Sequence, residues 1–262
     1  MKSNAPRTAG FTLVELLVAM GILAVILVGT VQITGIAQGS IRWAEKKIAS
    51  DSGARQLTAL LERDLREMIR RPDAPFEFQV QSGNDSLAFL ATRAGYARGE
   101  ASADRSTSLV RYESDPDGRF TRACLGFSFE GEDTVPLDPA AALPDIPDDN
   151  RQIVSDTVFR VEFEFLVDDG SGIVRQQKAP VTLDSLRGIV TTVAVLDPQS
   201  RGVLKSGDIP KLASLFDDAR DAEAPATTWT ATVLANTARG TSGIPADVFR
   251  GIRVYEQTLF LD

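Results

Sequence analysis

The sequence predicts an α+β fold in which one long N-terminal helix packs on the antiparallel β-sheet of a globular domain. Two observations lead to this fold class. Apolar residues fill residues 11–41 and then recur at helical intervals as far as residue 71. From Phe76 onward the apolar period changes from helical to alternating, which is the pattern of strands with one buried face.

The first part of the helix, residues 11–41, is long and apolar enough to cross a membrane, and Glu15 is its single charged residue. An ionised carboxylate is costly in hydrocarbon, so we expect Glu15 to have a function and a nameable partner. A short polar leader, residues 1–10, precedes the helix and carries Lys2 and Arg7 but no acidic residue.

The second part of the helix, residues 42–72, is predicted to be amphipathic. Apolar side chains recur on one face, acidic–basic pairs four residues apart support the other, and Pro72 ends the helix. We expect the apolar face to pack on the sheet. This face consists of Ala54, Leu57, Leu61, Leu65 and Met68, and the pairs are Glu62 with Arg66 and Glu67 with Arg71.

Residues 73–262 predict a β-rich domain, with two sub-sheets divided near a proline-rich loop at residues 136–150. Apolar and polar residues alternate cleanly in residues 76–81 and 160–165, which predicts sheets with one face in water. The predicted strands are residues 76–81, 87–92, 108–113, 120–130, 158–167, 173–178, 188–196 and 250–261.

One further helix is predicted in this domain, at residues 208–219, with Asp208 as its N-cap. The segment at residues 224–246 is ambiguous, with a helix favoured around residues 229–235. Within the second segment, Gly240-Thr-Ser-Gly243 lacks the full nucleophile-elbow pattern and is expected to be a loop.

The residue counts exclude several kinds of chemistry. Histidine is absent from the chain, which removes Ser-His-Asp and Cys-His nucleophile systems and His-ligated zinc. Cys124 is the single cysteine, and its position in a strand-like run predicts a buried structural thiol. These counts remove the commonest catalytic systems, and we expect a protein that is not an enzyme.

Charge and turn motifs limit the ligands. Residues 76–262 hold 18 basic and 29 acidic side chains, a net charge of −11, which argues against nucleic-acid binding by a basic patch. The turns at residues 115–118 and 168–170 have Asp and Gly but lack the further oxygen ligands of an EF-hand loop. We expect no cofactor, with calcium left as an open possibility.

The leader differs from a secretory signal peptide in where it can be cut. An ordinary signal has its small-residue cleavage site after the apolar region. Here the small pair Ala9-Gly10 precedes that region. Cleavage after Gly10 would keep the whole apolar helix on the protein, with Phe11 as its new N-terminus.

The segment GFTLVELLVAM, within residues 7–31, resembles the class III signal of type IV prepilins and of type II secretion pseudopilins. The resemblance implies that a prepilin peptidase cuts between Gly10 and Phe11 and methylates the Phe11 amine. It implies that Glu15 neutralises the terminal amine of a neighbouring subunit. It also implies a single-pass inner-membrane precursor with its head outside, an assembly platform in that membrane, and other pilin-like subunits as partners.

Within this family, the segment LREMIRRP at residues 65–72 and the size of the head look most like a J-type pseudopilin of type II secretion or a W-type minor pilin. A bulky acidic head favours a low-copy position near a fibre tip. Two alternatives stay open, a major pilin and an envelope enzyme or sugar-binding module that is merely anchored by the helix.

Overall fold

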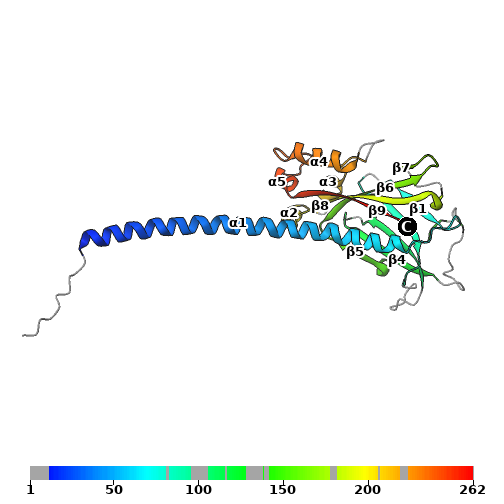
Figure 1. Ribbon diagram of the computed structural model, residues 1–262, viewed down its shortest axis with the longest axis horizontal. Coiled ribbons are helices and arrows are strands. Elements are labelled where there is room, and N and C mark those ends of the chain that lie inside the picture. The colour runs from blue at the N-terminus through cyan, green and yellow to red at the C-terminus, as the bar shows by residue number, and fades with distance from the viewer. Residues whose placement is uncertain are drawn as a thin grey trace, which may run out of the picture. The chain divides into compact units, whose positions relative to one another are not determined.

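A computed structural model describes residues 12–80, 83–95, 106–115, 117–127, 138, 142–177, 182–205, 207–218 and 224–261. The chain forms two compact units, Met1–Lys46 and Lys47–Asp262. Helix α1 (Leu13–Arg66) begins in the first unit and ends in the second. The predicted α+β class is confirmed, because this helix is followed by two antiparallel sheets (Figure 1).

The first part of α1 contains a few hydroxyl side chains, and these form hydrogen bonds within the helix itself. Thr30 and Thr34 each donate a hydrogen bond of 2.8 Å to the carbonyl four residues earlier, and Ser40 does the same at 3.1 Å. These hydroxyl groups therefore need no partner from outside the helix.

The second part of α1 buries the predicted apolar face. Leu57 and Leu61 are fully buried, and Leu65 is 2% exposed. They share one core with inner residues of both sheets, including Phe89 and Phe163. Burial of each leucine contributes roughly 1.5–3 kcal/mol, so this stripe fixes the helix on the head.

The helix ends at Arg66, earlier than the predicted end at Pro72. The reason is that the following backbone pairs with strand β2 (Ser86–Ala91): the Ile69 amide donates to the Leu90 carbonyl at 2.8 Å, and Met68 bridges Ala91. The expected Glu67–Arg71 helical pair is therefore wrong, and Glu67 pairs with Arg93 instead.

The first sheet is an antiparallel meander of five described strands. Its order follows the chain from β1 to β5, and its inner face lies against α1. The strands are β1 (Phe76–Gln79), β2, β3 (Thr107–Ser114), β4 (Phe120–Phe127) and β5 (Arg151–Ser155).

The second sheet has the order β7-β6-β8-β9 among its described strands, all antiparallel. The division between the sheets lies between β5 and β6, later than the predicted residues 136–150, because β5 pairs with β4. The strands are β6 (Val158–Asp168), β7 (Ile173–Gln176), β8 (Leu186–Leu196) and β9 (Ile252–Phe260).

Among the described residues, four helices lie between β8 and β9 in sequence, and the last three pack on the face of the second sheet that points away from α1 (Figure 1). Successive residues of β8 show the two faces: Val193 belongs to the core with α1, and Ala194 to the core with these helices. The helices are α2 (Pro198–Val203), α3 (Asp208–Ala213), α4 (Pro225–Asn236) and α5 (Ala246–Arg250).

Helix α3 corrects two details of the prediction. Gly207 is the N-cap, and Asp208 is the first helical residue, whose carboxylate accepts from the Lys205 amide at 3.2 Å. The helix ends at Ala213 rather than residue 219. In contrast, the favoured helix around residues 229–235 is confirmed within α4.

Candidate assembly site

The N-terminal end of α1 is held by a capping box. The Glu15 carboxylate accepts from the Thr12 amide at 2.9 Å and from the Thr12 hydroxyl at 3.0 Å, and the Thr12 hydroxyl accepts from the Glu15 amide at 3.3 Å. This reciprocal arrangement satisfies free amide groups at the start of the helix. A carboxylate here also complements the positive end of the helix dipole.

The structure therefore gives Glu15 a partner in its own chain. The role that the family resemblance implies for it, pairing with the terminal amine of a neighbouring subunit, stays a prediction. The carboxylate is turned back toward the segment that precedes the helix. Gly10 and Phe11, the predicted cleavage and methylation residues, lie outside the described residues. The contribution of Thr12 was missed, although the spacing Thr-x-x-Glu is a known helix-start signature.

The described part of the first unit exposes its apolar side chains. Leu13 is 75% exposed and Ile36 is 72% exposed. An 18-residue window within α1 has a mean hydropathy of 2.6, with none of it buried. By length and composition this helix fits a membrane anchor. An exposed apolar surface of this extent is typical of a membrane or protein interaction site.

The second part of α1 is fastened to the first sheet by a buried carboxylate, Asp64. Its side chain is 0% exposed and accepts from the Tyr112 hydroxyl at 2.7 Å and from Arg122 Nε. Arg93 Nε lies 3.3 Å from its other oxygen. Asp64 thus joins the helix to β3, to β4 and to the segment after β2.

The electrostatics of this joint follow from burial and charge. Burial raises the pKa of Tyr112 well above its usual value, and the neighbouring Asp64 carboxylate raises it further. Burial alone would lower the pKa of Arg122, but its hydrogen bond and charge interaction with Asp64 raise it overall. Both groups therefore keep their protons, and Asp64 keeps its donors, throughout the physiological pH range.

A second joint connects α1 to the other sheet. The Tyr255 hydroxyl of β9 donates to Asp51. Burial, together with Asp51, raises the pKa of Tyr255 to about 12. The helix is thus attached to both sheets by tyrosine–aspartate contacts as well as by its apolar face.

Comparison with known proteins bears on the N-terminal segment. The prokaryotic N-terminal methylation motif matches residues 6–31. Over these residues the chain resembles type IV pilin-like proteins. The motif implies processing by a prepilin peptidase and assembly with other pilin subunits. It ends within the exposed apolar part of α1 and contains both members of the capping box, Thr12 and Glu15.

Two other comparisons concern the curated proteins and the solved structures. None of the curated proteins matches the chain. Among solved structures, a type IV-like pilin from Thermus thermophilus is similar at 14% identity, over 79% of this chain and 94% of that chain, with a TM-score of 0.35. The resemblance to type IV pilin-like proteins therefore rests on the N-terminal motif.

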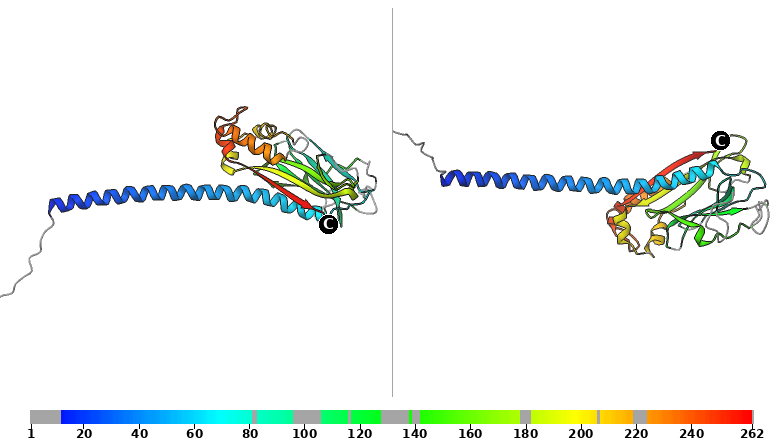
Figure 2. Two further views of the ribbon diagram at one scale, coloured as in Figure 1. Left: turned by 45° about the horizontal axis from the view of Figure 1, so that its top comes forward. Right: turned by 90° about the horizontal axis from the view of Figure 1, so that it is seen from below.

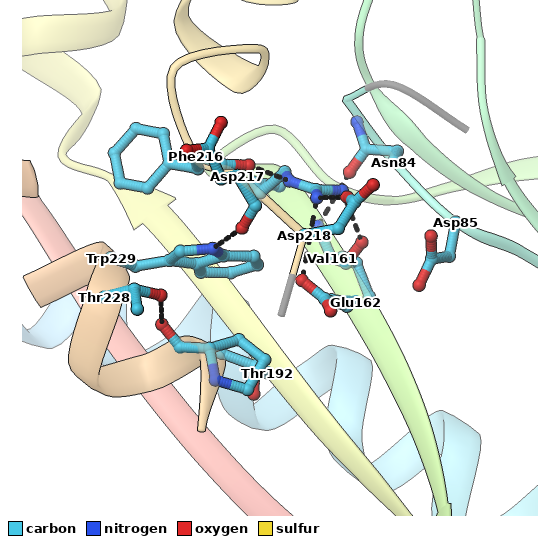
Figure 3. Close-up of polar contacts among 12 residues, drawn as sticks. Asn84, Asp85, Val161, Glu162, Thr192, Phe216, Asp217, Asp218, Thr228 and Trp229 are labelled. Carbon is cyan, nitrogen blue, oxygen red and sulfur yellow. Dashed lines mark hydrogen bonds and ion pairs between the residues drawn. The ribbon is translucent and has the colours of Figure 1, made fainter. Parts of the chain in front are cut away.

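The second compact unit has its own buried ionic cluster, centred on Arg160 of β6. Figure 3 labels its neighbours Glu162, Asp218 and Trp229. Arg160 is 0% exposed; it donates to the Phe216 carbonyl at 3.2 Å and pairs with Asp218. Its guanidinium lies 5.0 Å from the centre of the Trp229 ring, and the Trp229 indole donates to the Asp217 carbonyl at 2.8 Å. Arg160 and Trp229 thus hold the carbonyls of Phe216 and Asp217, which follow the end of α3.

The same cluster corrects the prediction that this strand has a wet face. Glu162 and Glu164 alternate with apolar residues, yet they are 2% and 5% exposed. Arg160 lies 3.6 Å from Glu162, and Arg175 donates to Glu164 at 2.8 Å. The acidic residues are buried because guanidinium groups compensate them. The cluster joins the helical layer to the sheet.

The aspartate-rich turns use their carboxylates locally. Asp115 accepts from the Arg119 amide at 2.8 Å, and Asp169 accepts from the Ser171 amide at 2.9 Å. Within the described ranges no group of three potential metal ligands is found. Calcium binding stays the open possibility that the sequence leaves.

Proposed function

We propose that this chain is a minor pilin-like subunit, a structural component that enters a fibre or pseudopilus at low copy near its tip. The observation that carries the proposal is the methylation motif continued by an exposed apolar helix with Glu15 as its one charge. Before assembly, the helix anchors a single-pass precursor in the inner membrane, with the head outside.

Assembly then follows from removal of the leader. A prepilin peptidase cuts between Gly10 and Phe11 and methylates Phe11, and an assembly platform transfers the helix from lipid into the fibre. In the fibre, Glu15 faces the terminal amine of a neighbour. This pairing replaces or supplements its contact with Thr12, and it compensates a charge that hydrocarbon alone would not tolerate.

The size and charge of the head support the minor role. The helices between β8 and β9 thicken the second sheet, and the distal part of the chain is strongly acidic. Repetition of such heads along a fibre would accumulate steric conflict and like-charge repulsion. The proposal includes two machines. In type II secretion the chain would be a J-type pseudopilin, and in a type IV pilus it would be a W-type minor pilin.

Cross-linking tests the low-copy position. Cysteines placed at the exposed residues Ser52 and Gln56 of α1, in a Cys124→Ser background, should capture other pilin-like subunits in assembled material. A cysteine at Thr227, exposed on α4, is the control and should give less cross-linking to those subunits. A ladder of self-cross-links from Ser52 or Gln56 would identify a major subunit and contradict the proposal.

A further inference from the structure

The two sheets of the head have four edge strands among the described residues, and one of them differs from the rest. Strands β1 and β7 have four residues each, and β5 has five. Strand β9 has nine residues and forms one edge of the second sheet (Figure 2). Short edge strands are a common protection against unwanted pairing, and β9 lacks it.

Other protections are also missing from β9. Its sequence, IRVYEQTLF, contains no proline, lysine or glycine, and it pairs with β8 in one continuous register without a bulge. Glu256, the charged residue near the middle of the strand, forms an ion pair with Arg175 of β7, with 3.0 Å between the guanidinium nitrogen and the carboxylate oxygen. The strand therefore presents a long, regular edge.

The orientation of the free backbone groups follows from two hydrogen bonds. The Leu261 amide donates to Arg187, and the Gly251 carbonyl accepts from Asp197, so the odd-numbered residues of β9 face β8. The amides and carbonyls of the even-numbered residues point away from the sheet. Within the described chain the Ile252 carbonyl accepts from the Arg253 guanidinium at 2.9 Å, and the backbone groups of the other four even-numbered residues have no hydrogen-bond partner. These residues are Val254, Glu256, Thr258 and Phe260, and Phe260 is 67% exposed.

A groove of about 210 Å³ runs beside this edge, between α1 and β9. Arg55 of α1 lines it and has no hydrogen bond or ion pair within the described chain, whereas Asp51 is already held by Tyr255. The Thr191 hydroxyl also lines the groove and is buried without a hydrogen-bond partner among the described residues. A side chain entering the groove would meet an unpaired cation and an unpaired hydroxyl.

We propose that β9 accepts an extended strand from a neighbouring pilin-like subunit, with an acidic side chain of that strand directed at Arg55. The proposal rests on the proposed function for the identity of the donor. Only an extended backbone matches a row of alternating donors and acceptors, and strand addition at a sheet edge is an established mode of recognition. The groove supplies specificity, and the edge supplies the hydrogen bonds.

A proline at Thr258 tests this pairing. Thr258→Pro removes an amide that points away from β8, so the ladder between β8 and β9 keeps all its hydrogen bonds. Thr258→Val is the matched control, because it keeps the amide and nearly the same side-chain volume. We expect the proline variant of the full-length chain, extracted in mild detergent, to bind its neighbouring subunit about tenfold more weakly, as loss of one main-chain hydrogen bond predicts.

Hydrogen exchange on the wild-type complex supplies the geometric readout. The amides of Glu256, Thr258 and Phe260 should exchange fast in the isolated chain and become protected in the complex. Retention of the neighbour by the Thr258→Pro variant at the wild-type level, or fast exchange of these amides in the complex, would overturn the proposal. So would a wild-type chain that binds no strand at all.

The two proposals fail in different ways. If the wild-type chain enters no fibre but still binds a protein that protects the even-numbered amides of β9, strand addition stands and the fibre role fails. If the chain enters fibres while those amides stay unprotected, the fibre role stands and strand addition fails. A second copy of this chain as the bound strand would contradict the assignment of the donor.

Discussion

Replacing Asp64 with alanine is expected to lower the free energy of unfolding of the head by about 3–5 kcal/mol, the usual cost of breaking a buried ion pair from one side. Arg122 would stay buried without its counter-charge, and the Tyr112 hydroxyl would lose its acceptor. The effect is large because Asp64 is completely buried. Chemical denaturation of a chain that starts near Arg42 measures it, since that chain retains the apolar face of α1.

Glu62→Ala is the matched control on the same helix. Glu62 pairs with Arg66 at 2.6 Å, but both side chains are substantially exposed, so a loss of only about 0.5 kcal/mol is expected. Equal destabilisation by the two substitutions would show that Asp64 is not a joint between the helix and the first sheet.

Replacing Glu15 with alanine is expected to abolish entry into a fibre while leaving the precursor in the membrane. The neighbour's terminal amine would lose its counter-charge in a low-dielectric environment, where an uncompensated charge costs about 3–5 kcal/mol. Loss of the capping box adds about 1 kcal/mol of helix destabilisation. Quantifying the chain in sheared or detergent-resistant assemblies, relative to its amount in membranes, measures the defect.

Thr12→Ala separates the two roles of Glu15. This variant removes the hydroxyl of the capping box but leaves the carboxylate available to a neighbour, so it should assemble. Glu15→Gln keeps a hydrogen-bond acceptor without the charge and should fail as the alanine variant does. Assembly of Glu15→Ala at the wild-type level would show that the carboxylate is incidental.

The features that can be predicted from the sequence are those that depend on the spacing of residues close together in the chain. The helix, its apolar face at Leu57, Leu61 and Leu65, and the alternating strands all follow from spacing along the chain. The methylation motif is local as well. Even Asp64 could have been found, because it lies three residues after Leu61 and therefore on the buried face of the helix.

The features that could not be predicted depend on partners far along the chain. Tyr112 meets Asp64 across 48 residues, and Asp218 meets Arg160 across 58. The same dependence on distant residues explains why the face of β6 that was predicted to be in water is buried. Alternation predicts which residues share a face of β6, but the residues that cover Glu162 and Glu164 come from other elements.

Determining the N-terminal residue of the protein in cells tests the central claim most directly. Intact-mass and N-terminal peptide spectrometry of the membrane-extracted protein should find a chain that begins at N-methylated Phe11 and lacks residues 1–10. Gly10→Val should block this processing by its bulk at the scissile position and leave the anchor inserted. An intact leader on the wild-type protein, or a cut beyond Val28 that removes the apolar helix, would contradict its assignment as a pilin-like subunit.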